Sequence, residues 1–169
     1  MIPSGSQTVG PFFNFGLTTN LKLGVLGGEG GERIRVSFRV TDGEGTPTPG
    51  DSMIELWQAD AQGRYDAVTG FGRLETQPDG TCVFQTVKPG RVDGQAPHIT
   101  VIVFARGLLK QLHTRLYFSG ELANAEDPVL ALAPESRRQT LMAREMEPGF
   151  WHMEIRLQGQ DDETVFFDV

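Results

Sequence analysis

Histidine and tyrosine are the side chains of this sequence best suited to bind a transition metal or to move protons, and the chain has three histidines and two tyrosines. In "APHITVIVFARG" (96–107), His98 stands two residues before Thr100. Alternate residues of a strand point to the same side, so two histidines at this spacing could share one metal ion, but threonine is a poor ligand. The segment is therefore compatible with a damaged metal site, a buried histidine, or half of a site that another chain completes.

The other two histidines show no metal-binding pattern. His113 lies in "KQLHTRLYF" and His152 in "FWHMEIRL", and we predict that both are hydrogen-bonded core residues of strands. The sequence contains no HxH, HExxH or CxxC pair, so residue spacing alone predicts no metal site. It also lacks the GxSxG elbow of hydrolases, the phosphate-binding loop and the dinucleotide fingerprint.

Tyr65, in "DAQGRYD", has two interpretations. It could be a turn residue that follows a strand, or it could be a phenolate ligand of ferric iron. A phenol ionises near pH 10 in water, so it is a good ligand at neutral pH only beside a strongly charged metal. One tyrosine and one histidine are too few for such a site, and the second tyrosine, Tyr117, is predicted to be a core or interface residue.

Arg106 follows the apolar run "ITVIVFA" and precedes Gly107. An arginine that ends a buried strand is often part of a salt bridge at the rim of a sheet. Its fork of donors could instead hold a carboxylate or a phosphate in a pocket. The position of the residue does not decide between the two.

The segment "SQTVGPFFNFGL" (6–17) combines a bend with aromatic side chains. Thr8, Gly10 and Pro11 predict the bend, and three phenylalanines follow within four residues. The segment could be an arm that fastens itself to the core, or a tight loop that lines a pocket. So many phenylalanines near a terminus indicate burial against something, which could be a partner chain.

The elements that must position these residues are predicted to be strands. In "RIRVSFRV" (33–40), apolar and polar residues alternate, which is typical of a half-buried strand. Similar runs occupy 52–60, 81–87, 98–107, 114–121, 151–159 and 163–169, with turn residues between them. Only "PESRRQTLMARE" (134–145) has a helical pattern. We predict one all-β domain over residues 1–169, an antiparallel β-sandwich with one short helix and an N-terminal arm at 1–32.

Composition limits the location and the partners of the chain. A formal net charge of −7 argues against nucleic acid as a partner. No apolar run is long enough to cross a membrane, and the first residues do not resemble a secretory signal. Cys82 is the single cysteine, so no internal disulfide can form. We expect a cytoplasmic protein.

Several of these segments together resemble the intradiol ring-cleavage dioxygenases. They are "SQTVGPFFNFGL", "IELWQADAQGRYD", "TVKPG", "APHITVIVFARG", "LHTRLYFSGE" and "DETVFFDV", in the order of the family and spread over almost the whole chain. The resemblance implies an O2-dependent opening of an aromatic ring between two hydroxyl-bearing carbons, with protocatechuate as the substrate.

Catalytic chains of this family hold a non-haem ferric ion, Fe(III), through two tyrosines and two histidines. Carried over to this sequence, the first tyrosine falls on Tyr65 and the first histidine on His98. The second tyrosine falls near Val92, and the second histidine falls on Thr100. Two ligand positions therefore hold residues that do not bind iron. The resemblance implies that "HIT" is the remnant of an iron site.

Within the family, the sequence is most similar to the alpha chains of hetero-oligomers in which a beta chain holds the Fe(III). The resemblance implies that this chain binds no metal and lines the substrate pocket of its beta partner. The matching positions are Thr8, Gly10, Pro11 and Phe12 in the arm, and Arg106. Relatives often have tyrosine at the position of Phe12, and no role follows for Asn14.

Two other functions are compatible with the same elements. One is a β-sandwich that binds or supports other molecules without catalysis, which the arm and Arg106 disfavour. The other is a stand-alone catechol-type dioxygenase, which the missing ligands at Val92 and Thr100 disfavour.

Overall fold

The architecture is that of a computed structural model of the 169-residue chain. The structure describes residues 8, 16–19, 24–43, 46–47, 52–159 and 161–168. Within these residues no helix is long and apolar enough to cross a membrane.

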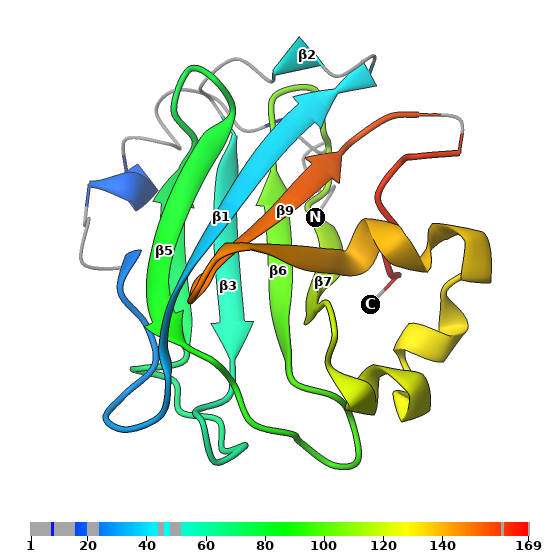
Figure 1. The fold of residues 1–169 in the computed structure, drawn as a ribbon. Coiled ribbons are helices and arrows are strands. Elements are labelled where there is room, and N and C mark those ends of the chain that lie inside the picture. The colour runs from blue at the N-terminus through cyan, green and yellow to red at the C-terminus, as the bar shows by residue number, and fades with distance from the viewer. Residues whose placement is uncertain are drawn as a thin grey trace, which may run out of the picture.

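The strands of the described chain form one mixed β-sheet. Its strands are β1 (Arg33–Asp42), β2 (Thr46–Pro47), β3 (Met53–Gln58), β4 (Phe71–Glu75), β5 (Thr81–Val87), β6 (His98–Phe104), β7 (Leu112–Phe118), β8 (Met142–Glu147) and β9 (Phe150–Arg156). They are hydrogen-bonded in the order β2-β1-β9-β8-β7-β6-β3-β4, and β5 pairs with β1. Strands β1, β5 and β9 lie in front of β3, β6 and β7, so the sheet folds into two layers (Figure 1).

Strand β8 is the corner at which the sheet passes from one layer to the other. Its first two residues, Met142 and Ala143, pair with β7, and Arg144 to Glu147 pair with β9 across a bulge. The β7–β8 pair is parallel, and so is the β1–β9 pair. The prediction of a purely antiparallel arrangement is therefore wrong at these two pairs, whereas the prediction of a mostly β chain is confirmed.

The hydrophobic core lies between the two layers, and the alternation of the sequence puts it there. Ile34, Val36, Phe38 and Val40 of β1 are all buried, as predicted. They face apolar side chains of the other layer, which are Ile54, Leu56, Ile99, Val101, Val103, Leu116 and Phe118. Full burial of each such side chain stabilises the fold by about 1.5–3 kcal/mol. Alternate residues of β3, β6 and β7 must therefore point away from the core, toward the outer face of this layer.

Three short 3-10 helices follow β7, in place of the single helix predicted over 134–145. They are η3 (Leu122–Glu126), η4 (Leu130–Leu132) and η5 (Glu135–Leu141). The predicted helix ends at Leu141 because Met142 begins β8 and pairs with Tyr117 of β7. The predicted strand at 163–169 is described to residue 168, and this part makes an isolated bridge between Phe167 and His113 in place of a regular strand.

A buried carboxylate connects these helices to the sheet. Asp127, which is 2% exposed, lies between η3 and η4. Its Oδ1 accepts hydrogen bonds from the Leu130 amide (2.7 Å), the Val129 amide (2.9 Å) and the Tyr117 hydroxyl (3.1 Å). Its Oδ2 accepts a hydrogen bond from the Ala96 amide (2.7 Å), two residues before β6. One side chain thus fixes η4, the start of β6 and the end of β7 together.

The protonation state of Asp127 follows from the same contacts. Burial alone would raise the pKa of this carboxyl, but the hydrogen bonds from Leu130, Ala96, Tyr117 and Val129 together hold the pKa below its ordinary value. A carboxyl with a depressed pKa in the folded state stabilises the fold above its unfolded-state pKa, and this contribution is lost as the pH falls through the folded-state pKa.

We predict that Asp127→Asn lowers the free energy of unfolding by about 2–4 kcal/mol at neutral pH, because an amide nitrogen would face the buried Ala96 amide. The wild-type chain should also lose stability below about pH 4, and this component should be absent in the variant. Urea unfolding as a function of pH measures both effects. Glu126→Gln, at a side chain that is 79% exposed, is the control and should change the free energy by less than about 0.5 kcal/mol. A neutral-pH loss no larger than that of the control would contradict the role of Asp127.

Candidate functional site

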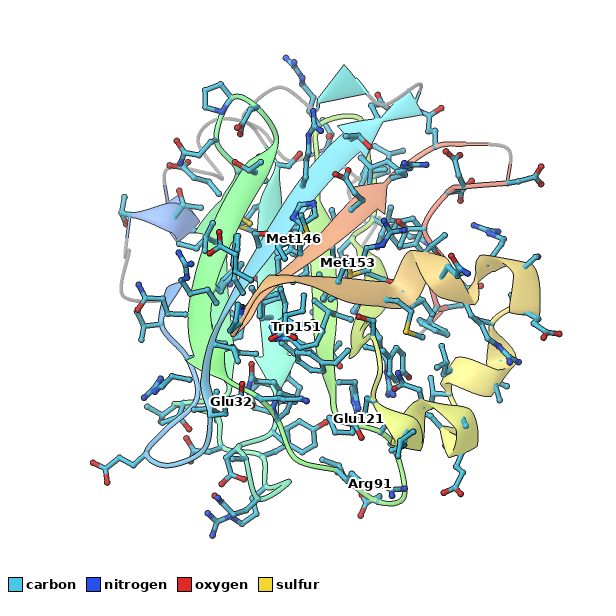
Figure 2. All side chains as sticks on the ribbon, viewed as in Figure 1. Glu32, Arg91, Glu121, Met146, Trp151 and Met153 are labelled. Carbon is cyan, nitrogen blue, oxygen red and sulfur yellow. The ribbon has the colours of Figure 1, made fainter. Side chains whose placement is uncertain are left out.

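The positions predicted to be the remnant of an iron site lie at one end of the molecule. His98 begins β6, and Tyr65 lies in the 59–70 loop that follows β3. Val92 lies in the segment that leads from β5 to β6. These loops occupy the lower end of the molecule in Figure 1, and Figure 2 shows Arg91, the neighbour of Val92, at the same end. The predicted set of positions is thus assembled by the ends of β3, β5 and β6.

Tyr65 is held in place by its loop and by a neighbouring ring. Its ring stacks on Trp57 with 5.6 Å between ring centroids and 3° between ring planes. Trp57 pairs with Thr100 across β3 and β6, so the stack lies beside the predicted position of the second histidine. Burial raises the pKa of Tyr65 above its ordinary value, and the positive charge of Arg115 partly opposes this rise. The phenol is therefore protonated at neutral pH.

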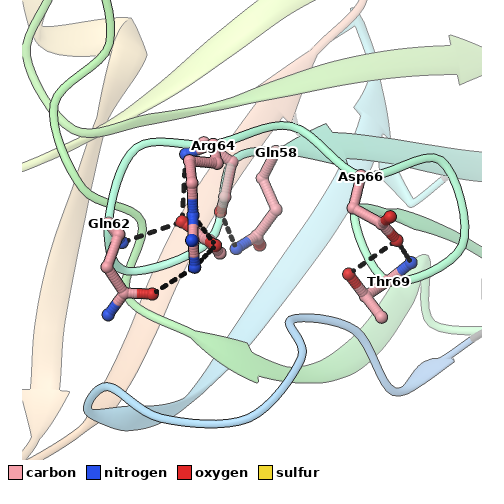
Figure 3. A network of polar contacts seen from close by, with 7 residues as sticks. Gln58, Gln62, Arg64, Asp66 and Thr69 are labelled. Carbon is pink, nitrogen blue, oxygen red and sulfur yellow. Dashed lines mark hydrogen bonds and ion pairs between the residues drawn. The ribbon is translucent and has the colours of Figure 1, made fainter.

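Two aspartates shape the Tyr65 loop. The Asp60 carboxylate accepts hydrogen bonds from the amides of Gln62 (2.8 Å) and Arg64 (2.9 Å), and it also pairs with the Arg64 side chain. Asp66 Oδ1 accepts a hydrogen bond from the Thr69 amide (2.8 Å) and another from the Thr69 hydroxyl (3.0 Å). Figure 3 shows both groups of contacts, one around Arg64 and the other between Asp66 and Thr69. Side-chain caps of this kind fix turns, so the position of Tyr65 is defined by its own loop.

Two glycines explain why the "GRY" and "KPG" segments approach each other so closely. Gly63 has a φ of 77°, and a Cβ at this position would lie 2.1 Å from the Arg91 carbonyl oxygen. A Cβ on Gly90 would lie 2.5 Å from the carbonyl oxygen of Ala61. The Gly90 amide donates a 2.9 Å hydrogen bond to the Asp60 carbonyl oxygen. Only residues without a side chain allow these backbones to touch, and the contact brings Val92 next to the Tyr65 loop.

His98 is a buried histidine with a satisfied hydrogen bond. It is 4% exposed, and its Nδ1–H donates to the Ala96 carbonyl oxygen at 2.8 Å. Burial lowers the pKa of the imidazole, although the bond to Ala96 opposes this effect, and so His98 is neutral at neutral pH. Its ring centroid lies 5.9 Å from that of Tyr117, the residue opposite it on β7.

Arg115 is a residue of this site that the sequence reasoning missed. It lies directly opposite Thr100 in the β6–β7 register. Its Nη1 donates to the side-chain oxygen of Gln95 at 2.6 Å, and it lies 3.4 Å from the Tyr117 hydroxyl oxygen. The available signal was the alternation of His113, Arg115 and Tyr117 in β7, which predicts a polar outer face on that strand.

The donor set of this site does not fit a ferric ion. Val92 offers no donor atom, and the Thr100 hydroxyl is a poor substitute for an imidazole. Tyr65 and His98 remain as ligand types, but the cationic Arg115 lies opposite Thr100 on the neighbouring strand. Within the described part of the chain, no three His, Cys, Asp or Glu side chains lie close enough together to hold a metal ion.

Two of the residues predicted to contact substrate, Thr8 and Arg106, belong to the other end of β6. The Gly107 amide donates to Thr8 Oγ1 at 2.7 Å, and the Thr8 hydroxyl lies 3.5 Å from the Ala105 carbonyl oxygen. Thr8 is therefore attached to the turn that carries the exposed Arg106. Because β6 rises about 3.3 Å per residue, this turn lies roughly 25 Å from His98. Gly10, Pro11, Phe12 and Asn14 lie outside the described residues.

The prediction of core positions for the two remaining histidines is only partly correct. His152 of β9 is hydrogen-bonded as expected, with Nδ1 2.7 Å from the Ser37 hydroxyl oxygen and Nε2 3.2 Å from Glu154 Oε1. It is half-buried, because it lines a surface groove of about 450 Å³. His113 of β7 is also half-buried, on the outer face of the other layer.

Comparison with known proteins connects this geometry to one family. A family model described as "Dioxygenase" matches residues 16–92. The chain is 41% identical to the protocatechuate 3,4-dioxygenase alpha chain of Burkholderia cepacia, over 97% of this chain and 96% of that one. It is 36% identical to the beta chain from the same organism, over 83% of this chain and 66% of that one. Among solved structures, it resembles the dioxygenase domain of a carbohydrate-binding fusion protein from Streptomyces sp. SirexAA-E, with a TM-score of 0.64 and 31% identity over 78% of this chain and 82% of that one.

We predict that Thr8→Val speeds hydrogen exchange of the Gly107 amide by about two- to tenfold, because that amide loses its acceptor. Thr8→Ser keeps the hydroxyl and should leave the exchange rate close to that of the wild-type chain. Exchange measured by NMR or mass spectrometry on the full chain tests the prediction. Equal rates in all three proteins would show that Thr8 does not hold the Arg106 turn.

Proposed function

The chain belongs to the intradiol ring-cleavage dioxygenase family, and we propose that it is the alpha chain of a protocatechuate 3,4-dioxygenase. The observation that carries this assignment is the 41% identity to such an alpha chain over nearly the full length of both sequences. The beta chain from the same organism is less similar and extends well beyond the matched part. The fold is taken to be the β-sandwich of that family, as a single domain with residues 1–32 as its arm.

The proposed reaction opens the ring of protocatechuate between its two hydroxyl-bearing carbons. Both atoms of O2 enter the product, 3-carboxy-cis,cis-muconate, so the reaction needs no further oxidant or reductant. The non-haem Fe(III) is assigned to the partner beta chain, where it would supply substrate chelation and activation toward O2. The tasks left to this chain are to shape the pocket, to position a charged side chain in it and to assemble with the beta chain. We also propose that the complex is cytoplasmic, in keeping with a single cysteine, which is buried.

The distance between the two ends of β6 supports a role in the partner's pocket. His98 and the Thr8–Arg106 turn lie too far apart to contact the same small molecule. In a pair of chains with one fold related by a pseudo-two-fold axis, one end of the first chain can meet the opposite end of the second. Thr8, Gly10, Pro11, Phe12 and Arg106 would then line the beta-chain pocket. Phe12 would line the pocket without the hydroxyl group of the tyrosine that relatives often have at this position.

The two rival functions have less support. A stand-alone catechol-type dioxygenase needs an iron ligand at Val92 and at Thr100, and neither residue is one. A binding module without catalysis does not account for full-length similarity to one chain of an enzyme. We therefore expect activity only when a beta chain with both tyrosines and both histidines is present.

We predict that co-expression with such a beta chain gives a hetero-oligomer that cleaves protocatechuate, whereas this chain alone has no activity. Obligate interfaces of this kind bury more than about 2,000 Å² in total. Removal of residues 1–12 should weaken both co-purification and turnover, because the arm is proposed to contact the partner. Size-exclusion chromatography and O2 uptake measure the two effects. Turnover by this chain alone, or an unchanged complex after the deletion, would count against the proposal.

We predict that Arg106→Ala lowers kcat/KM for protocatechuate by about ten- to a hundredfold, because a charge-assisted hydrogen bond to its carboxylate is lost. The effect on catechol, which lacks the carboxylate, should be much smaller. Lys110→Ala removes an exposed cation from the same loop and is the matched control. The measured quantity is the ratio of the two rates on intact complexes. A wild-type ratio in the Arg106 variant would show that the carboxylate contact comes from the beta chain.

A further inference from the structure

We propose that the guanidinium of Arg115 takes the place of a ferric ion among Tyr65, Val92, His98 and Thr100, and that its fixed charge keeps metal cations out of this chain. The inference rests on the proposed function, because it concerns an iron site that the chain has lost. It adds that the loss has a second cause, since restoring the ligands alone would not restore the site.

Arg115 is connected to three of the four positions, either directly or through one intermediate residue. It lies opposite Thr100 in the strand register. It donates to Gln95, which pairs with Val92 in an isolated bridge. It also contacts the hydroxyl of Tyr117, and Tyr117 lies opposite His98 in the strand register.

The fourth position, Tyr65, is reached across the same face of the sheet. Trp57, Thr100 and Arg115 lie side by side on β3, β6 and β7, and the Tyr65 ring stacks on Trp57. The positive charge of Arg115 also acts against the burial-driven rise in the pKa of Tyr65. The side chain of Arg115 therefore lies on the same face of the sheet as Thr100, and its charge acts on Tyr65.

The arginine is held where it lies by a directed series of hydrogen bonds. Burial raises the pKa of Tyr117 to about 12, so its hydroxyl keeps its proton and donates it to Asp127. The oxygen of the same hydroxyl is then free to accept a hydrogen bond from Arg115 Nη1, at 3.4 Å. The same Nη1 also donates to the side-chain oxygen of Gln95 at 2.6 Å. Displacing Arg115 would therefore leave Gln95 and Tyr117 without this donor.

A fixed monovalent cation is incompatible with a trivalent cation at the same place. The guanidinium of Arg115 is a cation, and its hydrogen bonds to Gln95 and Tyr117 keep it in place. Like charges a few ångströms apart repel strongly in a partly buried site. Under the proposed function, the charge of Arg115 accounts for the assignment of the Fe(III) to the beta chain.

The test restores the missing ligands with and without the arginine. The full chain is made as Val92→Tyr/Thr100→His, and as the same double variant with Arg115→Gln. Each is incubated with a ferric salt and desalted, then iron per chain is measured by elemental analysis together with the visible tyrosinate-to-iron absorption. The double variant should bind Fe(III) at least about a hundredfold more weakly than the triple variant.

Further variants separate charge from shape. Arg115→Lys in the double variant keeps the charge and should also bind iron weakly, whereas Arg115→Met, a second neutral side chain, should bind iron as the Gln variant does. Melting transitions show which variants are folded, so that one poorly folded neutral variant does not decide the result. Stoichiometric iron in the double variant with Arg115 intact, or no iron in folded neutral variants, would overturn the inference. Either result leaves the alpha-chain assignment unaffected, because that assignment is tested by co-assembly and turnover.

Discussion

The buried carboxylate of Asp127 is the interaction on which the lower end of the molecule depends. It accepts hydrogen bonds from η4, from Ala96 before β6 and from Tyr117 at the end of β7. These two strands carry His98, Thr100 and Arg115, so the relative position of those side chains follows from one charged group. A buried carboxylate is stable only when it is fully hydrogen-bonded, and that requirement makes the arrangement specific.

The two ends of β6 differ in the contacts that they make. At the lower end, glycine contacts bring the Tyr65 loop and the Val92 segment together, but the side chains that meet there do not form a metal-ligand set. At the upper end, the hydroxyl of Thr8 accepts a hydrogen bond from the Gly107 amide, in the turn that carries Arg106. A chain that keeps the scaffold of a catalytic site while presenting a different end to a partner is consistent with the proposed alpha-chain role.

Local sequence patterns predicted strands well where one face is apolar and less well elsewhere. The alternation in β1 placed Ile34, Val36, Phe38 and Val40 in the core, and β5 has the predicted bounds. Strand β4 was missed because only Gly72 and Leu74 face inward, so pairing with β3 defines it. Strand β8 was missed because "MAREME" is rich in helix-forming residues, yet its backbone completes the pairing of β7 and β9.

The sequence by itself determined the mostly β class of the chain, its family and the absence of iron ligands at Val92 and Thr100, because these depend on residue types and their local order. Only the tertiary structure decided that Arg115 lies opposite Thr100, that Gly63 touches the Arg91 backbone, and that Thr8 binds Gly107. Each of these contacts joins segments far apart in the chain. Their alignment is set by the register of paired strands and by the packing of loops, and no local pattern of residues specifies either.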